Sequence, residues 1–162
     1  MSLKSIRIKE APAVEPAGAV AAAPEVAPSS SFKWQVPTGW KPLVPGQEQV
    51  AKFAVPDQGA ARAVVSVSIF SNDTGGTLGN VNRWRGQIGL GPIEEADLAK
   101  NTTTLDPKGA GAILVDVSNN NRRLIGAIVP RGGRYYFYKL LGDADAVAPQ
   151  KDAFVAFVKS EP

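Results

Sequence analysis

Apolar and hydroxyl side chains alternate along residues 63–70, where single serines separate Val65, Val67 and Ile69. A period of two places successive side chains on opposite faces of an extended chain. The segment therefore predicts a β-strand with one buried face and one wetter face.

Weaker versions of this pattern recur along the chain. They predict strands at residues 32–36, 49–55, 101–105, 112–117, 122–129 and 134–141. The run of asparagines at 119–121 suits the left-handed backbone of a tight hairpin. Because consecutive strands joined by short turns cannot be parallel, we expect a mostly antiparallel sheet.

Helical spacing marks three other segments. A glycine-rich turn at residues 72–76 leads into a helix that ends near Ile88. Its apolar arc comprises Leu78, Val81, Trp84 and Ile88, while Asn80, Arg83 and Gln87 face away. A short helix is expected at 94–100 and a longer one at 148–160, with Pro149 in its first turn. Amphipathic helices imply a covered sheet face, so the predicted class is α+β.

The first 31 residues differ in composition from the rest. Residues 11–31 are almost entirely Ala, Pro, Val, Glu, Gly and Ser, which cannot bury enough surface to form a core. We interpret residues 1–31 as a Pro/Ala-rich, largely disordered tether and residues 32–162 as one α+β domain. Apolar and charged side chains alternate from Ile6 to Lys9. This short segment is predicted to be either an edge strand or part of the tail.

The chain contains neither cysteine nor histidine. Disulfides, thiol nucleophiles and histidine-dependent triads are therefore excluded, and zinc or copper sites lose their usual ligands. No apolar run approaches the roughly 20 residues of a membrane span, so we expect a soluble domain. The net charge of +3 is too small for a dedicated nucleic-acid binder. We expect no catalytic residues, cofactor or metal ion.

Three segments carry a resemblance to a known family: WQVPTGW at residues 34–40, GGTLGNVNRWRGQIGL at 75–90 and GAIVP at 126–130. Together they resemble an uncharacterised family of predicted bacterial envelope lipoproteins. The resemblance implies an exported protein, held at the membrane by a lipidated cysteine outside these 162 residues. The VPTGW pattern and the element order also look like the Mog1/PsbP-type α/β/α sandwich, whose members act mainly in binding or assembly.

The first predicted helix carries the strongest candidate site. Its amides and guanidinium groups suit carboxylate, phosphate or sugar hydroxyl ligands, and the glycines before it resemble an anion-binding helix start. The candidate residues are Gly75, Gly76, Asn80, Asn82, Arg83, Arg85 and Gln87. The plainer interpretation, which the pattern favours, is a packing helix whose Asn and Arg side chains bond neighbouring loops.

Two other groups of residues have a binding and a structural interpretation. Arg122, Arg123, Arg131 and Arg134 lie around the last hairpin and would attract an acidic polymer or anionic headgroups, or would be ordinary solvated or edge-protecting charge. Trp34, Trp40, Tyr135, Tyr136 and Tyr138 would form a sugar platform or pack in the core. The structural interpretation is favoured in both cases.

Carboxylates offer little catalytic potential. Glu94 and Glu95 are adjacent and would diverge around a helix, and Asp97 crowds the same turn. Asp143 and Asp145 are explained by helix capping. The leading hypothesis is therefore a non-enzymatic, envelope-tethered binding or assembly module for an unknown protein or envelope polymer. The alternatives are a hydrolase or lyase that uses Asp, Glu, Lys and Tyr, and a self-associating structural envelope protein.

Overall fold

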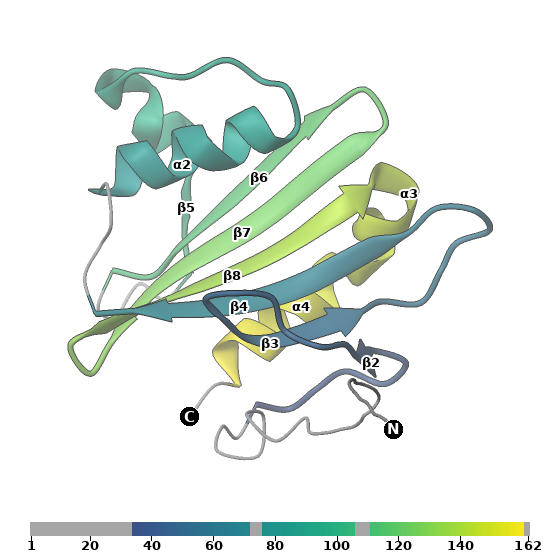
Figure 1. The fold of residues 1–162 in the computed structure, drawn as a ribbon. Coiled ribbons are helices and arrows are strands. Elements are labelled where there is room, and N and C mark those ends of the chain that lie inside the picture. Colours follow the sequence, from purple (N-terminus) through teal and green to yellow (C-terminus); the bar gives the residue numbers. More distant parts are fainter. Residues whose placement is uncertain (1–33, 72–75, 106–110, 161–162) are drawn as a thin grey trace, which may run out of the picture.

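The computed structural model describes residues 34–71, 76–105 and 111–160. These residues form a seven-stranded antiparallel sheet with helices on both faces (Figure 1). The sheet order is β2-β3-β4-β8-β7-β6-β5, so the central pair β4 and β8 joins segments far apart in the chain. The predicted α+β class is confirmed. The expected tether and the possible strand at residues 6–9 lie outside the described residues.

The strands are β2 (Lys41–Pro42), β3 (Gln49–Ala54), β4 (Ala63–Phe70), β5 (Thr103–Thr104), β6 (Ile113–Asn119), β7 (Arg122–Arg131) and β8 (Arg134–Asp143). The helical elements are α2 (Gly76–Gln87), η3 (Glu95–Asn101), α3 (Ala144–Val147), η4 (Ala148–Gln150) and α4 (Lys151–Lys159). The predicted strand at 101–105 shortens to two residues because the 3-10 helix η3 continues to Asn101.

The predicted strand at 32–36 is wrong where the structure describes it, because residues 34–36 are not extended in a sheet. The backbone N–H of Gln35 donates to Ser160 Oγ at 2.9 Å rather than to a neighbouring strand. The Trp34 indole N–H donates to the Tyr138 hydroxyl at 2.9 Å, which directs the ring into the core. Contacts with the C-terminal end of the chain thus override the local alternation.

The predicted helix at 148–160 is divided in the structure. Residues 144–147 form α3, residues 148–150 form the 3-10 turn η4, and α4 begins only at Lys151. Pro149 lies in the first turn of η4, where its missing N–H interrupts no helical hydrogen bond. The proline therefore separates two helical pieces rather than starting one long helix.

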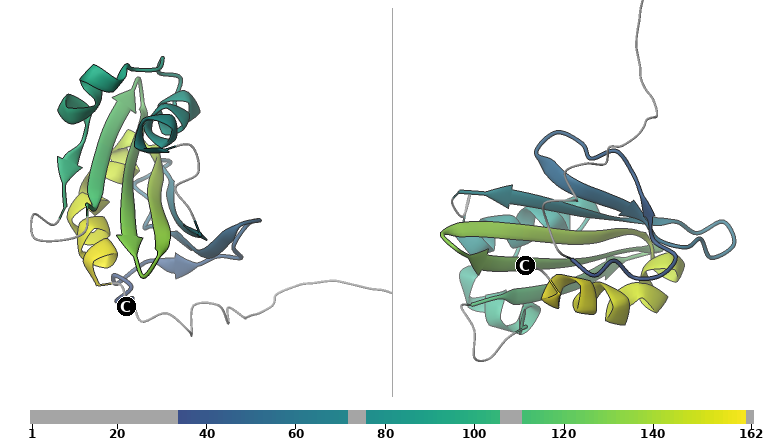
Figure 2. Two further views of the ribbon diagram at one scale, coloured as in Figure 1. Left: turned by 90° about the vertical axis from the view of Figure 1, so that its left-hand side faces the viewer. Right: turned by 90° about the horizontal axis from the view of Figure 1, so that it is seen from below.

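Two hydrophobic cores lie on opposite faces of the sheet. One packs the α4 side chains Phe154 and Phe157 against Val65, Tyr138 and Trp34. The other packs Val81 and Trp84 of α2 against β6, β7 and β8. Figure 1 shows α2 in front of the sheet and α4 behind it, and Figure 2 shows α4 running along its own face. The result is a three-layer helix–sheet–helix arrangement.

Tight turns keep the sheet antiparallel. Asn120 has a φ of 56° in the two-residue connection between β6 and β7, as the asparagine run predicted. Gly132 and Gly133, at φ values of 59° and 79°, close the hairpin between β7 and β8. Both central residues of that turn have the left-handed backbone that glycine adopts without strain.

Candidate functional site

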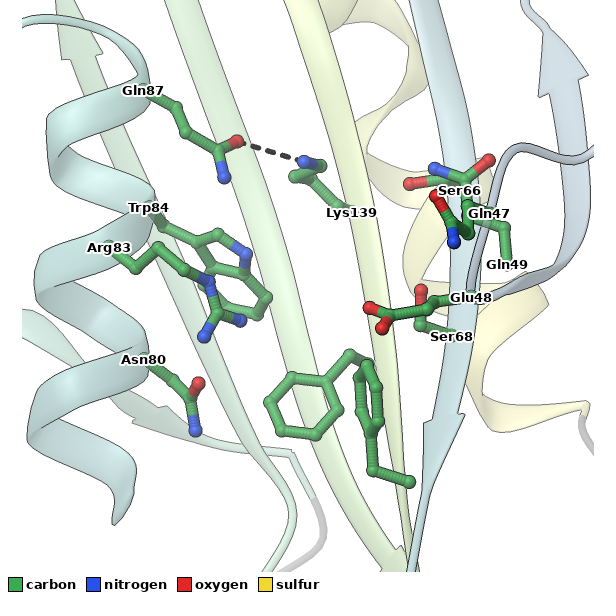
Figure 3. Close-up of a pocket in the computed structure, with 12 residues that line it drawn as sticks. Gln47, Glu48, Gln49, Ser66, Ser68, Asn80, Arg83, Trp84, Gln87 and Lys139 are labelled. Carbon is green, nitrogen blue, oxygen red and sulfur yellow. Dashed lines mark hydrogen bonds between the residues drawn. The ribbon is translucent and has the colours of Figure 1, made fainter. Parts of the chain in front are cut away.

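A pocket of about 510 Å³ lies beside α2, on the part of the sheet face that this helix leaves open (Figure 3). Side chains of β4 and β8 form its floor, α2 forms one wall, and the residues before and at the start of β3 form the other. The lining residues are Gln47, Glu48, Gln49, Ser66, Ser68, Phe70, Asn80, Arg83, Trp84, Gln87, Phe137 and Lys139. Its volume is in the range of small-molecule sites.

A single row of paired residues across the sheet explains where α2 rests. Lys52 pairs with Ser66, Ser66 with Lys139, and Lys139 with Gly126. A Cβ atom on Gly126 would lie 2.4 Å from Cζ3 of Trp84, so the glycine makes room for the indole. Trp84 of α2 therefore packs over Gly126 of β7 and edge-on against Phe137 of β8, beside the polar members of the row.

Lys139 is the half-buried cation of this floor. Its Nζ donates to Oε1 of Gln87 at 2.8 Å, which is a neutral acceptor (Figure 3). Burial lowers the pKa of Lys139, and the positive charges of Arg83 and Lys52 lower it further. Within the described residues, none of these three cations forms an ion pair. The pocket thus collects positive charge without an opposing carboxylate in contact.

The structure brings three of the predicted helix residues to this pocket. Arg83 and Gln87 are exposed and line it from α2, with Asn80 one turn before Arg83. The prediction that Asn80 faces away from the core is wrong, because its side chain is fully buried at 0% exposure. The helix is rotated so that the edge between its apolar and polar sides faces the pocket.

Asn82 and Arg85 have structural roles instead. Asn82 donates to the Ile93 carbonyl at 3.1 Å and accepts from the Ile93 N–H at 2.8 Å. Arg85 Nε donates to the Gly91 carbonyl at 2.7 Å. Both side chains fix the loop after α2, as the plainer interpretation of the helix predicts.

The two candidate glycines before the helix do not extend the site. Gly75 lies outside the described residues. Gly76 is the first residue of α2, has a φ of 73°, and is not among the residues that line the pocket. Its role in the described structure is to adopt a left-handed backbone at the start of the helix.

Sequence reasoning missed Lys139 and the opposite wall at residues 47–49. A signal for Lys139 was present, since a lysine between Phe137 and Leu141 falls on an otherwise apolar face of a period-two strand. Glu48 carries a structural signal only, a φ of 67° in a residue that is not glycine. No local sequence pattern brings it to the same pocket as Lys139.

The arginines considered as a basic patch form two separate pairs, with Arg131 opposite Arg134 at the β7–β8 turn and Arg122 next to Arg123. Arg122 and Arg131 lie at opposite ends of β7. Arg122 pairs with Asp143 at 3.6 Å, and Arg123 pairs with Asp116 at 2.6 Å. Asp143 occupies the N-cap position of α3 and Asp145 lies in its first turn, as expected, but the Asp143 side chain makes no capping hydrogen bond, because its Oδ2 accepts the Arg62 N–H at 2.9 Å.

The aromatic residues considered as a sugar platform are mainly core residues. Trp34, Trp40 and Tyr138 are buried, and Trp34 contacts Tyr138 edge-on with a centroid separation of 6.2 Å. Tyr136 and Tyr138 share one sheet face and Tyr135 the other, as strand alternation predicts. The core-packing interpretation is confirmed for the buried members.

The described part of the chain shows neither a metal-binding cluster nor a membrane-spanning helix. Nowhere in it do three or more acidic side chains gather in a way that would hold a metal ion. None of its helices has the length and apolar character needed to cross a membrane.

Comparison with known proteins supports the fold. No family model matches the sequence, and no curated protein matches it. A solved structure of similar fold is cyanobacterial PsbP (CyanoP) from Synechocystis sp. PCC 6803, with 17% sequence identity and a TM-score of 0.51. The similarity covers 81% of this chain and 85% of that one. The chain therefore has a PsbP-like α+β fold.

Proposed function

We propose that this protein is a non-catalytic binding module that holds an anionic ligand in the pocket beside α2. The observation that carries the proposal is that Lys139 and Arg83 both line this pocket, with the charge of nearby Lys52 also acting on Lys139, and that none of the three has an ion-pair partner in the described residues. A half-buried cation next to two like charges is unfavourable unless an anion compensates it. A bound carboxylate or phosphate group would supply that charge.

The neutral part of the pocket supports the same proposal. Gln87 already offers Lys139 an amide oxygen, which a charged oxygen would replace with a stronger hydrogen bond. Ser66 and Ser68 on the floor offer hydroxyls, and Phe137 and Trp84 offer apolar contact. An anion attached to a small organic body therefore fits better than a bare inorganic ion.

The enzyme alternative receives less support from this pocket. Acid–base catalysis by carboxylates needs two of them near the reacting atoms, with separated pKa values. Glu48 is the single carboxylate among the residues described as lining the pocket. We therefore propose recognition, without chemical conversion, as the activity of the module.

The resemblance of residues 34–40, 75–90 and 126–130 to envelope lipoproteins supports a location for it. In this proposal the domain is exported and tethered at the cell envelope, where it captures its partner through the pocket. Fractionation of the native cells tests the location. Recovery of the protein with the membranes is expected, and recovery in the cytoplasmic fraction would contradict it.

A titration tests the anion site. N-Acetylglycine carries one carboxylate, and its amide N-acetylglycinamide is the neutral match. We expect N-acetylglycine to shift the indole N–H signal of Trp84 in ¹⁵N–¹H spectra, with about millimolar affinity. The signals of Trp34 and Trp40 should not move, because these residues pack on the opposite face. The amide should have no effect on any of the three.

Single substitutions test which cations bind the anionic group of the ligand. Lys139→Gln and Arg83→Gln should each weaken binding of N-acetylglycine, because each removes one cation of the pocket. Lys159→Gln is the matched control, since Lys159 is exposed at the end of α4 on the other face. Equal binding of the carboxylate and its amide, or equal loss in all three variants, would contradict the proposal.

A further inference from the structure

Glu48 occupies a backbone position that a glutamate does not favour. Its φ is 67°, and among the described residues only Asn120 is another non-glycine residue with a positive φ. Asparagine tolerates this left-handed region, whereas a longer side chain is strained there by about 1 kcal/mol or more. The backbone at position 48 would favour glycine, so backbone conformation does not explain the glutamate.

The side chain of Glu48 faces the pocket. Figure 3 shows its carboxylate on the wall opposite α2, directed toward the space between Ser68 and Arg83. Glu48 takes part in none of the ion pairs of the described residues. Residues held in sparsely populated backbone regions cluster at ligand sites, and Glu48 is such a residue with its exposed carboxylate at a pocket.

Glu48 and Lys139 belong to different elements of the pocket and form no ion pair with each other. Glu48 adjoins β3, which is separated from Lys139 on β8 by the intervening strand β4. Two strand spacings amount to roughly 10 Å between backbones. Among the described lining residues, Arg83 and Lys139 supply the cations and Glu48 the carboxylate, while Lys52 of β3 lies outside the lining on the same side as Glu48.

We propose that the ligand is a small zwitterion, with its anionic group at Lys139 and Arg83 and its ammonium group at Glu48. This inference rests on the proposed anion site and adds the recognition of a positive group. A dianion would be repelled by Glu48, and a neutral ligand would leave both walls uncompensated. A separation of roughly 10 Å between the strands is similar to the length of an extended peptide of about three residues, so we assign the ligand to the class of short peptides.

Four forms of one peptide test this assignment: trialanine with free ends, its N-acetyl form, its C-terminal amide, and the form blocked at both ends. The free peptide should bind about threefold more tightly than the N-acetyl form, as for one exposed ion pair. The C-terminal amide should bind less well than the N-acetyl form, because it lacks the carboxylate that two cations would contact. The Trp84 indole signal reports binding in each titration.

Two variants separate recognition from folding. In Glu48→Gln, the free and N-acetyl peptides should bind equally, while the affinity for the N-acetyl peptide should not fall. Glu95→Gln is the control, since Glu95 is exposed on η3 and does not line the pocket. In that variant the preference for the free peptide should remain.

The outcomes distinguish the two proposals. If the N-acetyl peptide binds wild type as tightly as the free peptide does, the zwitterion inference is wrong while the anion site stands. The same holds if the preference persists in Glu48→Gln. If neither peptide with a free carboxylate binds, the anion site itself is wrong, and the inference that rests on it falls as well.

Discussion

The indole of Trp84 lies directly on Gly126, so closely that a Cβ atom at position 126 would come within 2.4 Å of Cζ3. This contact joins α2 to β7 at the row of residues that also contains Lys139. The position of the helix, and hence of the pocket wall, depends on the absence of a side chain there. Gly126 thereby links the packing of the second core to the geometry of the site.

Gly126→Ala should lower the free energy of unfolding by about 1–3 kcal/mol, because the methyl group overpacks a buried contact. Gly79→Ala is the matched control. Gly79 is exposed in α2 with no neighbouring atom near its would-be Cβ, so alanine should stabilise the helix by up to about 1 kcal/mol. Urea unfolding measures both, and equal effects in the two variants would show that the Trp84 contact is unimportant.

Glu48→Gly should raise the free energy of unfolding by about 0.5–1 kcal/mol, because glycine adopts a φ of 67° without strain. Asn120→Gly provides the comparison, at a φ of 56° that asparagine already tolerates. Asn120→Gly should change the free energy of unfolding by only a few tenths of a kcal/mol. A loss of stability in Glu48→Gly would mean that the side chain supports the fold, against a role in ligand recognition.

Asp116 ties the sheet to α4. It accepts from Arg123 at 2.9 and 2.6 Å and from Lys151 at 2.9 Å. Burial raises the pKa of Asp116, but the hydrogen bonds and charges of Arg123 and Lys151 outweigh it and hold the pKa below its ordinary value. A lowered carboxyl pKa means that the stabilisation is present above the unfolded pKa, about 3.9, and is lost as pH falls through the folded value.

Asp116→Asn should therefore destabilise the protein near pH 7 by up to about 1 kcal/mol, since the pair is partly exposed. The difference between variant and wild type should shrink as the pH is lowered from 5 to 2. Melting temperatures across this range measure it. A difference that stays constant with pH would show that the carboxylate charge does not stabilise the fold.

Lys139→Met tests whether the pocket lysine serves stability. The lowered pKa of Lys139 arises from burial and from the charges of Arg83 and Lys52, so the folded state disfavours its cation. The penalty applies below the folded pKa and is relieved as pH rises toward the unfolded value, about 10.4. At pH 7 the variant should be at least as stable as wild type and should bind N-acetylglycine more weakly than wild type does.

The lowered pKa of Lys139 also predicts how the difference in stability between Lys139→Met and wild type changes with pH. Between pH 8 and pH 10.5, wild type should gain stability relative to Lys139→Met. Urea unfolding at the two pH values measures the gain. A variant much less stable than wild type at pH 7 would mean that Lys139 supports the fold through its contact with Gln87.

Local patterns predicted most of the fold. The alternating segment at 63–70 forms a strand with the predicted limits. The alternation within the segment itself is enough to distinguish its buried face from its wetter face. Residues 34–36 did not follow their pattern, because the partners of Trp34 and Gln35 lie more than a hundred residues away. Contacts between residues so far apart in the chain produce no periodic pattern in the local sequence.

The site was predicted only in part, for a similar reason. Asn80, Arg83 and Gln87 were identified on the helix, but their orientation depends on the fit of Trp84 over Gly126. Lys139 and Glu48 join them through the pairing of β4 with β8 and β3, which links distant parts of the chain. Sheet order, rather than residue pattern, assembles the pocket.

The most direct test of the anion site is the titration of Lys139 itself, followed by ¹⁵N-detected NMR of the lysine side chains. Without ligand, the pKa of Lys139 should lie below the ordinary lysine value, owing to burial and to Arg83 and Lys52. With saturating N-acetylglycine it should rise, because a bound carboxylate favours the charged amine. A titration of Lys139 that is unchanged by N-acetylglycine would contradict the proposal that this lysine receives the ligand's anionic group.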